Sequence, residues 1–435
     1  MRLPWPHQGN IARFENLLNL LKRDDEPDDA LAGRVIYRTK EDVHDWDGQP
    51  LFPGRRVAEP IVVDLGPDYR DWIERIHDFF APPKAGAAMS EPRRRSANWR
   101  CAQALQWAAS SPQAGLGYLV RQAVRAGWTP SKRPVLADAL AALRPYRMGP
   151  PDEPADALFG RILKEIDRQR QDADVEDIEE VDDEPSAPDA PTLDALLCDG
   201  IRLMRSSADE KWDVLKQRVL DPAGSEKVVL FAQPIETVTA LAGYLERTTG
   251  VRPALIVGGQ DDATRQREIE SFRRTDGPRY LISSRAGGEG INLQVSRRLV
   301  HLDVPWNPMD MEQRVGRVHR FESRQTILVD TLVVKSSREE AAYRVAREKL
   351  AHIAHVLVDP EKFEALFSRV MSLIPPEDFV GLIVHKPGDG LTDEQQRRRL
   401  AEMVRQGYQS WADFNRRFAQ QQQRAIRLLD PGLAT

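Results

Sequence analysis

The chain has 435 residues, of which 41% are hydrophobic and 30% charged, a composition that allows two or three globular domains. No apolar run approaches the ~20 residues that a membrane helix needs, and the two cysteines, Cys101 and Cys198, have no disulfide-framework or metal-site spacing, so we expect a soluble, cytoplasmic protein. The net charge of −5 becomes +5 without residues 172–189, which hold ten acidic and no basic residues, so the charge does not exclude a polyanionic partner.

The first part of the chain is predicted to be mainly helical. After an opening turn, "PHQGN", helical spacing of leucines predicts a helix over residues 10–24. A strand-like "EPIVVDL" precedes a helix over residues 68–80, and a Pro-, Ala- and Arg-rich loop is expected over residues 81–96. Residues 97–171 are helical with breaks, and the acidic run that follows is predicted to be a disordered linker. The same run is also compatible with a nucleic-acid mimic that shields a basic groove.

The second part has the alternation of short strands and helices that is typical of a parallel, doubly wound sheet. Apolar segments read "KVVLFA", "PALIV", "RYLIS", "RLVHLD" and "TILVDTLVV", and helices are predicted at 235–248, 262–274 and 308–320. The segment from Arg265 to Arg324 contains twelve arginines and eight acidic residues. A polyanion-binding surface and an ordinary solvated face both explain this excess.

A glycine-rich segment, "SSRAGGEGINLQ", follows the third of these strands directly. Glycines allow backbone amides to approach a phosphate or nucleotide closely, and ligands of doubly wound sheets bind beyond the carboxyl ends of the strands. A plain glycine turn is the alternative interpretation. The spacing excludes the dinucleotide-binding fingerprint.

The predicted helix with the sequence "MEQRVGRVHR" places Gln313, Gly316, Arg317 and Arg320 on one face, since they are spaced by three and four residues. Two guanidinium groups beside a glycine gap suit a phosphate chain. A solvated stripe would have the same pattern. The preceding turn, "LDVPWNP", begins with Asp303 at a strand end, and its Trp306 is either a platform for a base or a packing anchor.

In order and spacing, these segments resemble the second RecA-like lobe of superfamily 2 helicases, in particular the Swi/Snf-type branch that includes bacterial RNA-polymerase-recycling ATPases. The resemblance covers roughly residues 208–350, and the opening "LPWPHQGN" is similar to the family's third motif. It implies a RecA-like doubly wound sheet with a mainly helical amino-terminal remnant and a helical carboxyl-terminal extension. The implied domains are a first-lobe remnant (1–90), a helical insertion (91–171), the acidic linker (172–195), the helicase C-terminal lobe (196–355) and the extension (356–435).

The resemblance also implies roles for individual residues. Arg317 and Arg320 match the arginine fingers that face ATP, and Gln313 lies on the same nucleotide-facing side. The loop that couples the nucleotide site to DNA would contain Gly288, Glu289 and Gly290. Contacts with the sugar–phosphate backbone would come from Ser283, Ser284 and Arg285.

Two motifs that a complete motor needs are missing from these residues. No Gly-Lys-Ser or Gly-Lys-Thr phosphate loop occurs, and no Asp-Glu pair closes an apolar strand. We therefore expect part of an ATP-dependent DNA helicase or translocase that is inactive without a first lobe supplied by a partner chain. Double-stranded DNA is the expected nucleic acid, and ATP would bind with Mg2+ only in the presence of the partner. A truncated gene product and a non-catalytic nucleic-acid-binding module are the alternatives.

Overall fold

The computed structural model describes most of the chain between residues 51 and 335 and a short stretch near residue 400. The described residues are 20, 23, 43, 51–52, 54–81, 91–149, 154–172, 189–206, 209–284, 291–304, 308–319, 325–335, 394–395, 398–399, 401–409 and 412. Among them, no helix combines the length and the hydropathy that crossing a bilayer requires. The expected helix at 10–24 and most of the expected extension at 356–435 lie outside them.

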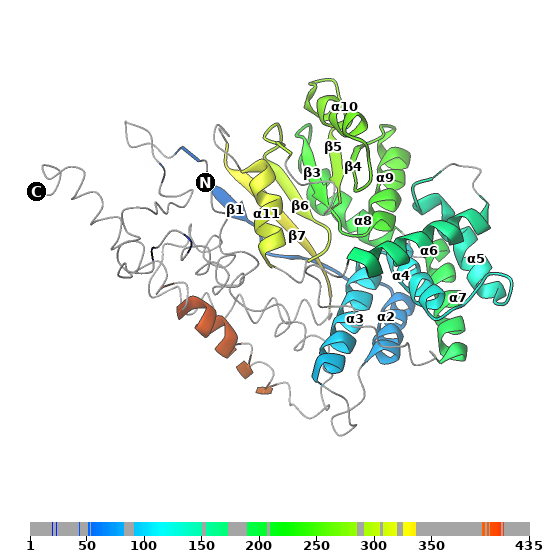
Figure 1. Cartoon of the computed structure of the whole chain (residues 1–435). Coiled ribbons are helices and arrows are strands. Elements are labelled where there is room, and N and C mark those ends of the chain that lie inside the picture. Colours follow the sequence, from blue (N-terminus) through cyan, green and yellow to red (C-terminus); the bar gives the residue numbers. More distant parts are fainter. Residues whose placement is uncertain are drawn as a thin grey trace, which may run out of the picture.

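The centre of the molecule is a seven-stranded sheet with the order β1-β7-β6-β3-β5-β4, in which β2 also pairs with β7 (Figure 1). All of the strand pairs are parallel. The strands β3, β4 and β5 are buried along their whole length, because helices cover both faces of the sheet. The predicted α/β class with a parallel, doubly wound sheet is confirmed. The strands are β1 Arg55–Val57, β2 Ile61–Val63, β3 Val228–Phe231, β4 Ala254–Ile256, β5 Tyr280–Ser283, β6 Arg298–His301 and β7 Ile327–Val334.

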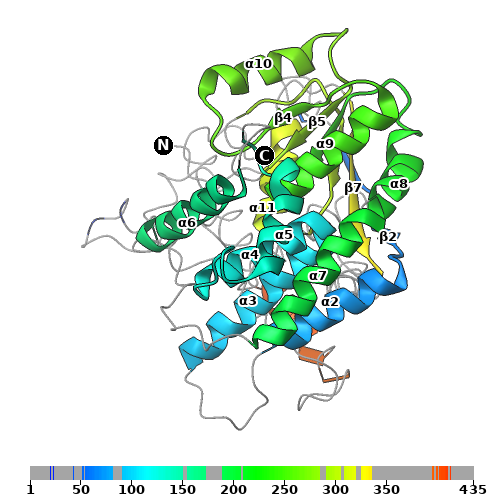
Figure 2. The same ribbon diagram turned by 90° about the vertical axis from the view of Figure 1, so that its right-hand side faces the viewer.

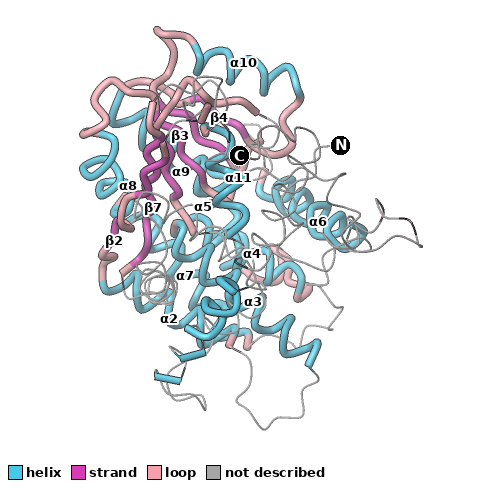
Figure 3. The backbone as a smooth tube through the Cα atoms, turned by 90° about the vertical axis from the view of Figure 1, so that its left-hand side faces the viewer, coloured by secondary structure: helices cyan, strands magenta, loops and turns pink. Residues whose placement is uncertain are grey.

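Two hydrophobic cores lie on opposite faces of this sheet, whose strands are magenta in Figure 3. Leu230 of β3 belongs to the core that includes Leu241 of α9, whereas the adjacent Phe231 belongs to the core that includes Phe272 of α10 and Val318 of α11. Because successive side chains of a strand point to opposite faces, α9 covers one face and α10 and α11 cover the other. The three helices span Ile235–Thr249 (α9), Asp262–Arg273 (α10) and Pro308–Val318 (α11).

Residues 55–63 form the outermost strand of the sheet, with a bulge in its middle. Val57 pairs with Val329 and Ile61 pairs with Leu332, so three residues oppose two on β7. The bulge contains Pro60, which has no amide hydrogen to contribute to a ladder. The described part of the expected first-lobe remnant is thus built into the sheet of residues 228–334. The domain boundaries at 90 and 171 stay predictions.

Six helices between residues 67 and 206 form a cluster, here called the helical module, against the α9 face of the sheet (Figure 2). Its core is continuous with that of the sheet. The expected loop at 81–96 is wrong for residues 91–96, because α3 begins at Glu91 and already buries Ser96 and Ala97. The helices are α2 Pro67–Phe80, α3 Glu91–Ser110, α4 Pro112–Arg125, α5 Pro134–Leu143, α6 Ala155–Asp172 and α7 Ala190–Ser206.

Trp72 of α2 lies at the centre of the helical module. Its indole Nε1 donates a hydrogen bond of 2.9 Å to the Leu196 carbonyl of α7, and its side chain is 1% exposed. The ring occupies the space that a side chain at Gly115 or Gly200 would need: added Cβ atoms would lie 2.6 Å and 2.9 Å from it. Two glycines therefore allow helices α4 and α7 to pack closely on one tryptophan.

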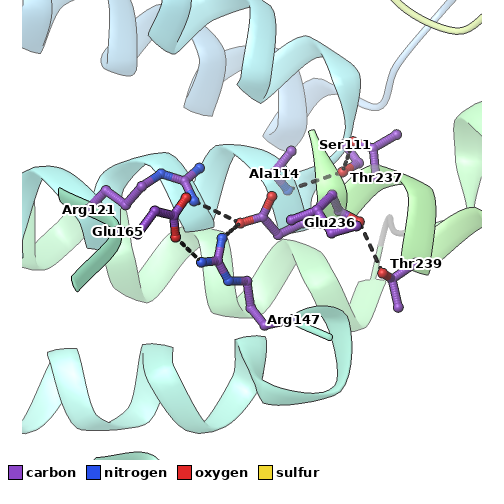
Figure 4. A network of polar contacts seen from close by, with 9 residues as sticks. Ser111, Ala114, Arg121, Arg147, Glu165, Glu236, Thr237 and Thr239 are labelled. Carbon is purple, nitrogen blue, oxygen red and sulfur yellow. Dashed lines mark hydrogen bonds and ion pairs between the residues drawn. The ribbon is translucent and has the colours of Figure 1, made fainter. Parts of the chain in front are cut away.

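A buried charge cluster joins the module to the first turn of α9 (Figure 4). The Glu236 carboxylate is fully buried and accepts hydrogen bonds from Arg121 Nη1 at 3.0 Å and Arg147 Nη1 at 2.9 Å. Arg147 also pairs with Glu165 of α6. Burial on its own would raise the pKa of Glu236, but the two guanidinium groups outweigh this effect and hold the pKa below its usual value. Glu236 is therefore charged, and three segments of the module are tied to it.

We expect Gly115→Ala to destabilise the protein by about 1–3 kcal/mol, because the new methyl group would overlap the Trp72 ring and the Ala108 backbone. Gly160→Ala on α6 is the matched control: its Cβ would meet no atom within 4 Å, so helix propensity should stabilise the protein by about 0.5–1 kcal/mol. Urea denaturation of both variants measures the difference, and equal effects of the same sign would contradict the packing assigned to Trp72.

Candidate nucleotide and nucleic-acid site

The loops that follow β3, β5 and β6 leave the sheet at the same edge, because parallel strands all end on one side. The predicted glycine-rich loop follows β5, and the predicted arginine helix, α11, follows β6. A backbone hydrogen bond of 3.0 Å from Leu293 N to the Arg317 carbonyl joins the two segments across the intervening β3. The structure thus brings together two motifs that are more than twenty residues apart in the sequence.

The three described members of the predicted stripe lie on the less buried side of α11. Gln313 is exposed and Gly316 and Arg317 are half-buried, whereas Arg314 and Val318 are buried. A Cβ added to Gly316 would have no neighbour within 4 Å, so the backbone of this helix is open on that side. A phosphate chain could approach the helix there.

Ser283 and Ser284, predicted to contact a nucleic-acid backbone, are both buried at the end of β5. The Ser283 hydroxyl donates to the Ser284 carbonyl at 3.1 Å, and the Ser284 hydroxyl accepts from Gly258 N at 3.2 Å. The Ser284 hydroxyl thus connects the end of β5 to the loop after β4, whereas the Ser283 hydroxyl bonds to the neighbouring residue. Their contact with DNA stays a prediction, and it would require them to become accessible.

The remaining predicted site residues lie outside the part of the chain that the structure describes. They are Arg285, Gly288, Glu289, Gly290 and Arg320, together with Trp306 of the turn before α11.

The structure adds a buried pair that the sequence analysis missed. Arg314 Nη1 lies 3.3 Å from Asp303 Oδ1, and both side chains are at most 5% exposed. The other Asp303 oxygen, Oδ2, accepts from the backbone amide of Gln233 at 2.6 Å. The sequence placed Asp303 at a strand end and Arg314 within the arginine-rich helix, but their pairing depends on the packing of α11 against β6. Arg314 therefore holds the helix in place, while Arg317 lies on its open side.

His301 is fully buried at the end of β6, next to this pair. Burial lowers the pKa of the imidazole well below its usual value, and the positive charges of Arg314 and Arg55 act in the same direction. The ring is consequently neutral at physiological pH. Its Nδ1 and Nε2 have no hydrogen-bond partner within the described part of the structure. Among the described residues, the positive charge at this end of β6 thus comes from Arg314 and Arg55.

The described residues offer no group of three or more His, Cys, Asp or Glu side chains that could hold a metal ion. What they offer a nucleotide is a guanidinium group, an amide side chain and an open helix backbone on α11. This set suits the outer phosphates of a triphosphate, and it does not include the carboxylates that a magnesium ion prefers.

Residues 210–322, from the start of α8 (Glu210–Leu215) to just beyond α11, match the family model "Helicase conserved C-terminal domain". This segment holds the β5 loop and the arginine helix. The chain therefore contains a segment that matches a conserved helicase C-terminal domain.

Among curated relatives, the chain is similar to an uncharacterized ATP-dependent helicase, YqhH, of Bacillus subtilis, with 32% identity over 29% of this chain and 22% of the relative. It is 29% identical to the ATP-dependent helicase FUN30 of Saccharomyces cerevisiae over 38% of this chain and 14% of the relative. It is 28% identical to the RNA polymerase-associated protein RapA of Proteus mirabilis over 45% of this chain and 21% of the relative. The matches span at most 22% of these relatives' lengths.

Among solved structures, the chain is similar to the SWI2/SNF2 ATPase C-terminal domain of Sulfolobus solfataricus, with a TM-score of 0.38 and 12% identity over 74% of this chain and 97% of that one. It is similar to the C-terminal part of the Fun30 ATPase domain with a TM-score of 0.36 and 17% identity, over 74% of this chain and 99% of that one.

Substitutions of Arg314 and of Arg317 should differ sharply in their effect on the free energy of unfolding. Arg314→Met leaves the buried Asp303 carboxylate without its cation, which we expect to cost about 3 kcal/mol of the free energy of unfolding. Arg317→Met, on the less buried side of the same helix, should cost less than about 1 kcal/mol. Urea denaturation monitored by tryptophan fluorescence compares them. A larger loss for Arg317→Met would contradict the roles assigned here.

Proposed function

We propose that this chain provides the second lobe of an ATP-dependent DNA translocase that couples ATP hydrolysis to movement on nucleic acid. The observation that carries the proposal is the placement of Arg317 on the open side of a helix that is itself fixed by the buried Arg314–Asp303 pair. In this arrangement the Arg317 guanidinium group belongs to a helix whose position is fixed by a buried ion pair. Such a group can stabilise the charge of a transferring phosphoryl group, which contributes about 10³-fold or more to the rate in phosphoryl-transfer enzymes.

The proposal assigns the remaining chemistry to a first lobe supplied in trans. Binding of the β- and γ-phosphates and of Mg2+ requires a phosphate loop and an Asp-Glu pair. The 435 residues contain no Gly-Lys-Ser or Gly-Lys-Thr sequence. In the completed site, Gln313, Arg317 and Arg320 would face the nucleotide from this lobe, and the loop with Gly288, Glu289 and Gly290 would couple the nucleotide site to DNA.

Double-stranded DNA is the proposed nucleic acid. Two observations support a polyanionic partner: the net charge of +5 outside the acidic run, and the excess of arginine between Arg265 and Arg324. Arg285 would contact the backbone directly, and Ser283 and Ser284 would do so after a local opening at the end of β5.

The 435-residue chain on its own should show no DNA-stimulated ATP hydrolysis, because it lacks the phosphate and magnesium ligands of a first lobe. A phosphate-release assay with highly purified protein, ATP, Mg2+ and duplex DNA tests this expectation. Robust turnover that co-purifies with the chain through several separation steps would overturn it.

When the first RecA-like lobe of a bacterial relative is added, we expect hydrolysis to appear and Arg317→Ala or Arg320→Ala to reduce it by about 10³-fold, with little change in DNA affinity. Arg252→Ala is the control, since Arg252 precedes β4 at the opposite edge of the sheet and pairs with Glu268 at the surface. If Arg317→Ala and Arg320→Ala both leave the rate of hydrolysis unchanged, the two residues are not arginine fingers. DNA binding without hydrolysis in the mixture would favour the alternative, a non-catalytic nucleic-acid-binding module.

A further inference from the structure

The loop that leads from β6 into α11 is held by the helical module as well as by its own lobe. Gln106 of α3 donates from Nε2 to the Val304 carbonyl at 2.7 Å, and Ser110, at the end of the same helix, donates to Asp303 Oδ2 at 3.4 Å. Gln106 is 2% exposed and Ser110 is 1% exposed. Both bonds cross between segments that are almost two hundred residues apart.

Asp303 connects three separate parts of the structure. Its carboxylate accepts from Gln233 N in the loop after β3, from Ser110 of α3, and from Arg314 of α11. A buried carboxylate needs all of its hydrogen-bond donors, because an unmatched oxygen in this environment is costly. The position of α3 therefore affects the same carboxylate that holds the arginine helix.

The end of α3 is itself held firmly. The Ser110 and Ser111 hydroxyls lie 2.9 Å and 2.8 Å from Thr237 Oγ1 of α9, and Lys211 Nζ donates to the Ala109 and Ser110 carbonyls at 3.0 Å and 3.3 Å. The Glu236 cluster adds a charged anchor one residue away from Thr237. The module thus contacts the lobe through several buried polar interactions, and it can set the position of the 302–304 loop.

We infer that Gln106 and Ser110 are positioning residues for the arginine helix: through Val304 and Asp303 they fix the start of α11 and thereby the placement of Arg317. The inference rests on the proposed function for its effect on hydrolysis. By this inference the helical module has two roles: it packs on the lobe, and it helps to align the proposed ATPase site. Displacement of a reacting group by about 1 Å can lower a rate by up to about 10²-fold.

Hydrogen exchange of the full 435-residue chain tests the mechanical part without any need for hydrolysis. In Gln106→Leu and Ser110→Ala, the amides of α11 should exchange about fivefold faster than in the wild type, and so should the amide of His319 just beyond it, which donates to the Val315 carbonyl. The amides of α10 serve as an internal reference and should not change.

Tyr69→Phe is the matched control. The Tyr69 hydroxyl donates to the Ala108 carbonyl of α3 at 2.7 Å, so this variant also loses a buried hydrogen bond to the same helix, but one that does not reach the 302–304 loop. We expect normal protection of α11 in Tyr69→Phe. Unchanged α11 protection in Gln106→Leu and Ser110→Ala, or equal loosening in Tyr69→Phe, would overturn the inference.

The second measurement uses the mixture with a first lobe. Gln106→Leu should lower kcat about 10-fold and change the KM for ATP less than about twofold, whereas Tyr69→Phe should keep the wild-type kcat. An unchanged kcat in Gln106→Leu, when the wild type is active, would overturn the effect on alignment. If α11 loosens as expected but even the wild-type mixture does not hydrolyse ATP, the proposed function fails while the coupling of α3 to α11 stands.

Discussion

The attachment of the helical module to the sheet depends on one buried carboxylate, that of Glu236. It lies at the start of α9, where the helix dipole favours a negative charge, and it receives two guanidinium groups from the module. The energetic consequence is asymmetric. A buried ion pair adds little net stability over apolar packing, but loss of one member leaves an uncompensated charge. We therefore expect the helical module and the lobe to fold and unfold together. The buried ion pairs also favour one orientation of the module on the lobe.

The same physics operates at Asp303, two residues beyond the end of β6. Two carboxylates at the edge where the strands end, Glu236 and Asp303, both take partners from the module. Helix α3 consequently covers the ends of β3 and β6, a position that doubly wound sheets generally leave to ligands. Under the proposed function, a nucleotide would approach the less buried side of α11, where Gln313 is exposed. The geometry of the candidate site is thus determined in part by residues that precede the lobe by a hundred positions or more.

The sequence predicted the strands and helices between residues 227 and 334 almost to the residue, because strands buried on both faces read as continuous apolar runs. It predicted the open stripe on α11 from helical spacing alone. It did not reveal that residues 55–63 pair with β7, since register between segments some 270 residues apart leaves no local pattern. It left Arg314 off the stripe on α11 but did not reveal its role, because only the position of Asp303 makes this arginine structural. The sequence also did not reveal that Ser283 and Ser284 are buried, because their burial depends on β3 and β4, the strands on either side of β5.

The bulged strand at residues 55–63 has a consequence for where the folding unit ends. The segment that matches the helicase domain model stops at residue 322, before β7, and begins long after the strand that covers the far edge of β7. A polypeptide cut at those limits would expose β6, an apolar strand that is central in the complete sheet, as an unpaired edge. Such edges are templates for association with other chains. The segment that matches the helicase model is therefore shorter than the unit that has to fold together to leave no such edge exposed.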